Sequence, residues 1–153
     1  MLEFNEELVL LDLIAPDSES VIRSLADKLY GQRLVSSDYG QKTFERELNH
    51  PTGLPTTPFF IAFPHADADG VRISSLAIAT LRNPVVFKNM ADPEEDLLVD
   101  LVLMLANNSP EEQVQTLRSL ALIFGESEKL VALRSLSTPG EVVAWFRLEL
   151  SLD

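Results

Sequence analysis

The sequence offers few side chains for chemistry at neutral pH, because it contains no cysteine and only two histidines, His50 and His65. Imidazole titrates near neutral pH and can act as a nucleophile or as an acid–base group. The absence of cysteine excludes disulfides, thiolate metal sites and cysteine nucleophiles. The search for a reactive residue therefore starts with these two positions.

His65 stands directly behind an apolar run. Residues 59–63 read Phe-Phe-Ile-Ala-Phe, and Pro64 separates this run from the histidine. The ring of Pro64 restricts φ and removes a backbone N–H, so a strand predicted here ends stiffly and presents His65 at a rigid sheet edge. Such support suits a nucleophilic or acid–base imidazole. The alternative interpretation is a loop histidine that bonds a nearby carbonyl.

His50 lies beside Pro51 in a polar loop, and we interpret it as a solvated side chain. A metal site built from both histidines with Asp67 or Asp69 lacks the close ligand spacing of known motifs, so we expect no metal. The sequence has neither a glycine-rich phosphate loop nor a serine elbow motif. His65 is therefore the leading candidate for chemistry.

The charge of the chain excludes one class of partner. With 24 acidic and 12 basic residues its formal net charge is −12, whereas nucleic-acid binding requires clustered Lys and Arg. Hydrophobic residues make up 46% of the sequence. A chain of this length buries about two-thirds of the surface that its unfolded form exposes. We expect one domain over residues 1–153 and no nucleic-acid partner.

Neither a targeting segment nor a membrane span is evident. Residues 1–20 contain no Lys or Arg, which a signal peptide carries near its start. The longest apolar stretch, 97–106, contains Asp100 and is far shorter than the roughly 20 residues of a membrane helix. We expect a cytoplasmic protein without direct membrane insertion.

The elements that must position these residues are apolar strands and amphipathic helices. Apolar runs predict strands at 8–14, 59–63, 76–81, 85–87 and 97–106. Apolar residues at helical spacing predict helices between Asp17 and Gly31, at 37–48, 110–124 and 126–136, and from Pro139 onward. This mixture predicts a single α/β (α+β) domain.

Two local features allow more detailed predictions. Residues 49–58 contain three prolines and one glycine, so we expect a loop without regular structure. Ser109, Pro110 and Glu112 predict a helix start with a capping box, in which Ser109 and Glu112 each bond the other's backbone N–H. The expected buried face of this helix consists of Val114, Leu117, Ala121 and Phe124.

Three short motifs follow one another along the chain: Arg46-Glu47, then Pro51-Thr52-Gly53-Leu54, then Ile61-Ala-Phe-Pro64-His65. In this order and spacing they resemble the enzyme IIA domain of the fructose–mannitol type, from the bacterial phosphoenolpyruvate-dependent sugar phosphotransferase system. The galactitol branch of this family looks closest. The resemblance covers nearly the whole chain and implies a central mixed β-sheet flanked by helices.

The resemblance implies that His65 is a phosphorylation site. His65 would accept a phosphoryl group from the phosphocarrier protein HPr and pass it to the cysteine of a sugar-specific enzyme IIB, which works with a membrane enzyme IIC. This transfer requires in-line positioning and charge stabilisation, without a cofactor or a metal. Because the chain has no cysteine, we expect enzyme IIB to be a separate protein.

The resemblance also points to residues around the phosphate. Arg46 matches the family's active-site arginine, whose planar fork suits phosphoryl oxygens, although it can also be read as an ordinary helix-surface arginine. Thr52 and Gly53 would offer a hydroxyl and a backbone N–H, or serve simple turn chemistry. Gln113 aligns with a second histidine of mannitol and fructose relatives. Glutamine can donate a hydrogen bond but cannot carry a positive charge.

The sequence leaves three functions open. The first is a phosphoryl-transfer component for uptake of a sugar or sugar alcohol, galactitol-like in type. The second is a regulatory module, in which the phosphorylation state of His65 controls binding to another protein. The third is a domain that has lost activity, as the departure at Gln113 suggests. For the first, the acidic charge would attract a basic or mixed surface on HPr.

Overall fold

Five strands form one mixed sheet in a computed structural model, which describes residues 2–151. In chain order they are β1 (Val9–Leu13), β2 (Gly53–Leu54), β3 (Phe60–Ala62), β4 (Ser75–Lys88) and β5 (Asp96–Ala106). Across the sheet their order is β1-β4-β5-β3-β2. The pairs β1–β4 and β3–β5 are parallel, whereas β4–β5 and β2–β3 are antiparallel. The predicted mixed α/β architecture is confirmed.

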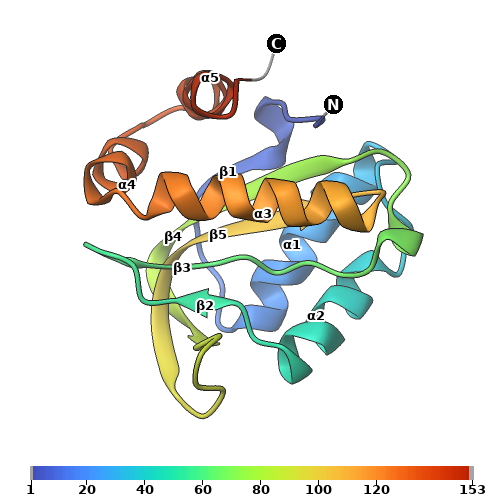
Figure 1. The fold of residues 1–153 in the computed structure, drawn as a ribbon, viewed down its shortest axis with the longest axis horizontal. Helices are drawn as coiled ribbons and strands as arrows, with labels where there is room; N and C mark the ends of the chain where they lie inside the picture. The colour runs from blue at the N-terminus through green and yellow to red at the C-terminus, as the bar shows by residue number, and fades with distance from the viewer. Residues whose placement is uncertain (1, 152–153) are drawn as a thin grey trace.

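Helices lie in front of this sheet and behind it in Figure 1, where α3 passes in front and α1 lies behind. The α-helices are α1 (Ser18–Gly31), α2 (Tyr39–Asn49), α3 (Pro110–Phe124), α4 (Ser127–Arg134) and α5 (Pro139–Glu149). Two short 3-10 turns are η1 (Glu6–Leu8) and η2 (Ala68–Gly70). α1 packs against α2 and β4, and α5 packs against β1 and η1. None of the helices within residues 2–151 has the length and apolar character that a membrane crossing requires.

The second half of β5 forms the centre of the core. Residues 101–106 are all buried, and β5 lies between β4 and β3. Because elements cover this strand on both faces, its residues are continuously apolar and do not alternate with polar ones. This buried strand is the support on which the segment after β3 rests.

Two predictions about strands were wrong. β4 runs without a break from Ser75 to Lys88, although Asn83-Pro84 was expected to separate two strands. Its pairing with β5 shifts register between Thr80 and Val85, and Pro84 is exposed at this irregularity, where its missing N–H is tolerated. The expected loop 49–58 contains β2, which pairs with β3.

The start of α3 also differs from the expectation. Ser109 Oγ accepts from the Glu112 N–H at 3.1 Å, but the Glu112 carboxylate bonds to Ser74 Oγ at 3.1 Å instead of completing a capping box. The buried face is rotated relative to the predicted one and consists of residues at i, i+3 and i+4 spacing. Val114 and Ala121 are exposed, and the buried residues are Leu120, Ile123 and Phe124.

Candidate functional site

The segment that follows β3 carries His65 along β5. His65 forms a parallel bridge with Leu105, and the Leu105 N–H donates to the Pro64 carbonyl oxygen at 3.2 Å. Pro64 therefore ends the regular strand without ending its contact with the neighbouring strand. The backbone of His65 is held on the sheet, as the apolar run and Pro64 predicted.

The His65 imidazole is buried, with 8% of the residue surface exposed. Its Nδ1 lies 2.8 Å from the Phe63 carbonyl oxygen. A carbonyl can only accept, so this bond places the proton on Nδ1 and the electron pair of the neutral ring on Nε2. Burial lowers the pKa of His65; the Phe63 carbonyl opposes this, the Arg46 charge reinforces it and the Asp67 charge opposes it. The neutral ring at pH 7 is the form that a nucleophile requires.

Tyr39, the first residue of α2, holds the chain next to His65. Its buried hydroxyl donates to the Leu105 carbonyl oxygen at 2.9 Å and accepts from the Ala66 N–H at 3.2 Å. Burial raises the pKa of Tyr39 to about 12, so the hydroxyl keeps its proton. This role could not be predicted from the sequence, because an aromatic residue on a helix indicates core packing and not the partner of its hydroxyl.

A Tyr39→Phe variant is expected to be less stable by about 1–3 kcal/mol, since it leaves the buried Ala66 N–H and Leu105 carbonyl without their partner. Urea unfolding should show a lower midpoint with an unchanged slope. Tyr30→Phe is the matched control, because Tyr30 is 52% exposed. Equal midpoints for Tyr39→Phe and wild type would contradict this role.

Arg46 lies in the last turn of α2 and lines a pocket of about 430 Å³. Its Nη1 is 4.0 Å from Asp67 Oδ1, and the Asp67 side chain is 87% exposed. The buried Nε of Arg46 has no hydrogen-bond partner within residues 2–151. A long ion pair to an exposed carboxylate is weak. The guanidinium therefore retains donors for another anion.

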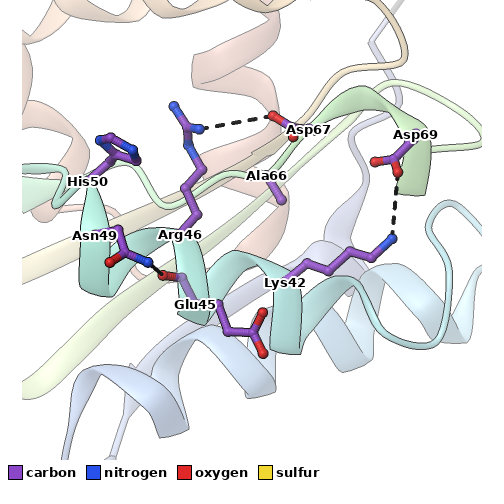
Figure 2. A pocket seen from close by; sticks show the side chains of 8 residues that line it. All are labelled: Lys42, Glu45, Arg46, Asn49, His50, Ala66, Asp67 and Asp69. Atoms are coloured by element: carbon purple, nitrogen blue, oxygen red, sulfur yellow. Dashed lines mark hydrogen bonds and ion pairs between the residues drawn. The ribbon is translucent and has the colours of Figure 1, made fainter.

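The same pocket collects other groups from α2 and from the segment after His65 (Figure 2). His50 lies beside Arg46, and its exposed imidazole follows the end of the helix. Lys42 pairs with Asp69 at 3.8 Å and with Asp38 at 3.5 Å. The other lining residues are Glu45, Asn49, Ala66 and Asp67. The pocket thus places three basic side chains, those of Lys42, Arg46 and His50, near Ala66, the residue after His65.

The Thr52 hydroxyl is hydrogen-bonded within the protein, whereas the resemblance predicted that it would contact the phosphate. Thr52 is buried, and its N–H and hydroxyl donate to the two carboxylate oxygens of Glu47, each at 2.8 Å. Its Oγ1 also accepts from the Phe63 N–H at 3.0 Å. A hydroxyl has one proton, so this arrangement leaves none for a phosphoryl oxygen. Thr52 instead connects Glu47 to the segment that carries His65.

Gly53 is also placed by the sheet. It lies in β2, and its carbonyl oxygen accepts from the Met90 N–H at 2.8 Å. A Cβ at this position would lie 2.5 Å from the Lys88 carbonyl oxygen, so a larger residue would separate the two backbones. The structure therefore explains the glycine by close backbone approach, and its predicted contact with a phosphate stays a prediction.

Gln113 lies near the start of α3 and is not among the residues that line the Arg46 pocket. Its Oε1 is buried and has no hydrogen-bond partner within residues 2–151. That oxygen can only accept, so a hydrogen bond to a phosphoryl oxygen would have to come from Nε2. Its predicted role at the phosphate stays a prediction. Across residues 2–151, no three or more His, Asp or Glu side chains are grouped so that they could hold a metal ion.

Residues 3–148 match the family described as "Phosphoenolpyruvate-dependent sugar phosphotransferase system, EIIA 2". The chain belongs to this family. Enzyme IIA domains are phosphotransferases with a phosphohistidine intermediate, so the predicted family and enzyme class are confirmed. The match covers the segments that position His65, Arg46 and Thr52.

Two curated relatives differ in what they do. The galactitol-specific EIIA component of Escherichia coli (strain K12) is 28% identical over 113 residues, which cover 74% of this chain and 73% of that protein. The transcriptional regulator ManR of Bacillus subtilis (strain 168) is 30% identical over 138 residues, or 90% of this chain. The matched part is 20% of the length of that regulator.

The fold agrees with that of the mannitol enzyme IIA of Escherichia coli. Its crystal structure has a TM-score of 0.77 and 24% identity, covering 94% of this chain and 99% of that one. The complex of that enzyme with phosphorylated enzyme IIB has a TM-score of 0.74 and 22% identity, covering 99% of both chains. At these identities, the similarity shows a shared fold.

Proposed function

We propose that this chain accepts a phosphoryl group from phospho-HPr on Nε2 of His65 and passes it to the cysteine of an enzyme IIB. The observation that carries this proposal is the bond from the buried His65 Nδ1 to the Phe63 carbonyl oxygen at 2.8 Å. It directs the electron pair of a neutral imidazole to Nε2. Membership of the family supports phosphoryl transfer as the reaction.

The transfer balances without a cofactor. Nε2 attacks phosphorus, the bond between phosphorus and the HPr histidine nitrogen breaks, and its electron pair stays on HPr. In the second transfer the thiolate of enzyme IIB attacks, and the bond from phosphorus to His65 Nε2 breaks. In-line positioning and stabilisation of charge supply most of the catalysis in phosphoryl transfer. His65 needs no base, because its Nε2 is unprotonated before attack.

The Arg46 pocket is the proposed place for the phosphoryl oxygens. The Arg46 fork has a buried Nε without a partner within residues 2–151, and only a 4.0 Å contact to Asp67. A phosphoryl group carries two negative charges near neutral pH, and charge-assisted bonds to a guanidinium are strong. Lys42 and His50 add basic groups on the same side, and Gln113 is proposed as a further donor through its amide.

The partners are part of the same proposal. An enzyme IIB as acceptor is supported by the mannitol enzyme IIA, which shares this fold and was solved with phosphorylated enzyme IIB. Galactitol or a related sugar alcohol, taken up through a membrane enzyme IIC, is the proposed cargo of the system. Its support is the 28% identity to a galactitol-specific component. We place the reaction in the cytoplasm and assign it to one domain, residues 1–153.

Incubation of the full chain with labelled phosphoenolpyruvate, enzyme I and HPr tests the function. The expected product is a single acid-labile, base-stable phosphohistidine on the His65 peptide, and added enzyme IIB should remove the label. Omission of HPr is the control. Failure to acquire label from HPr, or label on another residue, would overturn the proposal.

Transfer from phospho-HPr is expected to slow about tenfold between low and physiological salt. The chain carries a formal charge of −12, and steering of a basic surface weakens as the Debye length falls from about 30 Å at 0.01 M to about 8 Å at 0.15 M. Rapid-quench measurements in KCl, with sucrose as an uncharged control for viscosity, give the rate. A rate independent of salt would remove the electrostatic argument.

A regulatory role is the second candidate, because the chain matches a segment of the transcriptional regulator ManR over 90% of its own length. In that case, the phosphorylation state of His65 would control binding to another protein. The two roles separate by the fate of the label. Transfer to a cysteine of enzyme IIB favours transport, whereas stable phosphorylation that alters binding to a regulator favours control.

A further inference from the structure

We propose that Glu47 and Thr52 are positioning residues that hold His65 in the tautomer protonated on Nδ1. Neither side chain would touch the phosphoryl group. The effect of these two residues on phosphoryl transfer rests on the function proposed above, whereas the tautomer of His65 can be measured in the absence of any partner. The proposal gives a role to Glu47, the residue next to Arg46.

A continuous series of hydrogen bonds joins Glu47 to His65. The Thr52 hydroxyl donates to Glu47 Oε1 at 2.8 Å, and the Thr52 N–H donates to Oε2 at 2.8 Å. Thr52 Oγ1 accepts from the Phe63 N–H at 3.0 Å. The Phe63 carbonyl oxygen then accepts from His65 Nδ1 at 2.8 Å. Each of these bonds is buried, so water does not readily replace a lost partner.

The carboxylate sets the direction of this series. An ionised carboxylate can only accept, so the Thr52 hydroxyl must point its single proton at Glu47. The lone pairs of Oγ1 then face the Phe63 N–H. With the proton reversed, two donors would face each other and the buried N–H would lose its acceptor. Glu47 thus determines that Thr52 serves residue 63 as an acceptor.

The effect on His65 is geometric. The N–H and the carbonyl of Phe63 belong to different peptide groups, so polarisation does not pass directly from one to the other. Fixing the N–H restricts the rotation of residue 63, and with it the direction of the carbonyl that receives the Nδ1 proton. If this carbonyl turns away, the proton can move to Nε2, where it blocks the nucleophilic electron pair.

Burial of Glu47 is hard to explain by stability alone. The residue is 6% exposed, and burial raises the pKa of Glu47, while the bonds from Thr52 and the charge of Arg46 oppose the rise. A buried charge adds little stability relative to an apolar residue of similar size. The burial of Glu47 is explained if its carboxylate positions the reactive histidine, to which it is joined by the series of hydrogen bonds.

The test measures the tautomer and the transfer rate in the same proteins. Full chains with ¹⁵N-labelled histidine are compared by long-range ¹H–¹⁵N spectra at pH 7.5, and phosphoryl acceptance from phospho-HPr is measured by rapid quench. The variants are Thr52→Val, Thr52→Ser and Glu47→Gln. Thr80→Val is the matched control, because Thr80 is also buried and its Oγ1 accepts a backbone N–H, from Asp12 at 2.9 Å.

Wild type, Thr52→Ser and Thr80→Val should show His65 protonated on Nδ1. Thr52→Val and Glu47→Gln should increase the population protonated on Nε2 and slow acceptance by about 10- to 100-fold. A folded Glu47→Gln or Thr52→Val chain with the wild-type tautomer would overturn the proposal. Glu47→Gln keeps the shape of the side chain and serves if Thr52→Val does not fold. Absence of transfer in wild type would overturn the proposed function and leave the tautomer test intact.

Discussion

A His65→Gln variant is expected to acquire no label from phospho-HPr, a loss of at least about 10³-fold. In wild type the Phe63 carbonyl oxygen accepts from His65 Nδ1 at 2.8 Å. The glutamine amide can still donate to this oxygen, but the amide nitrogen has no nucleophilic electron pair. Rapid-quench labelling followed by peptide mapping measures the loss. Because the variant keeps a donor at this position, its unfolding midpoint should change much less than its activity.

The second histidine provides the matched control. His50 is exposed and lies beside Arg46, whereas His65 is buried on β5, so His50→Gln should still be labelled at His65 with less than about a tenfold loss in rate. Label on His65→Gln at the wild-type level would show that the wrong nucleophile has been assigned. Loss of label in His50→Gln alone would lead to the same conclusion.

The pH profile of wild type belongs to the same prediction. Burial lowers the pKa of His65, so the neutral ring persists below the usual histidine value of about 6.5. The rate of acceptance should therefore fall as His65 gains a proton on Nε2, with the midpoint of the decline below pH 6.5. A decline centred above pH 6.5 would contradict the lowered pKa.

An Arg46→Gln variant is expected to slow phosphoryl acceptance by about 10²- to 10³-fold. The reason is that the guanidinium lines the pocket beside Ala66, and its only ion pair within residues 2–151 is the 4.0 Å contact to Asp67. Arg46→Lys should recover only part of the rate, because lysine keeps the charge but not the planar fork. The rate constants come from rapid-quench measurements at one salt concentration.

Unfolding measurements should show that Arg46 acts in phosphoryl transfer and not in stabilising the fold. The one ion pair that Arg46→Gln breaks within residues 2–151 is a long contact to an exposed carboxylate, so its unfolding midpoint should stay near that of wild type. Arg23→Gln is the matched control, because Arg23 pairs with Glu19 at 2.8 Å on α1, and its transfer rate should be unchanged. An Arg46→Gln chain that is stable and fully active would remove Arg46 from the mechanism.

The order of the elements was predictable because local patterns determine it. Helical periodicity indicated α1 and α5, and the structure shows a capping box of Thr138 and Glu141 at the start of α5. The wrong strand predictions concern β2 and β4, whose extent depends on pairing with a neighbouring strand. β4 continues past Pro84 because β5 pairs with it on both sides of an irregularity, and β2 forms because β3 offers it a partner. Such pairing depends on residues far away in the sequence.

The sequence by itself identified the chemical groups of this protein: the histidine behind Pro64, the arginine of the Arg46-Glu47 motif and a chain without cysteine. These groups can be identified from residue types and the short spacings between them, because covalent geometry keeps such spacings the same however the chain folds. The tertiary structure alone decided that the Phe63 carbonyl is the partner of His65 Nδ1, and that the Thr52 hydroxyl bonds Glu47 and the Phe63 N–H. It also placed the Tyr39 hydroxyl on Leu105, 66 positions away. The physical reason is that a buried hydrogen bond exists only where strand register and helix packing bring donor and acceptor together.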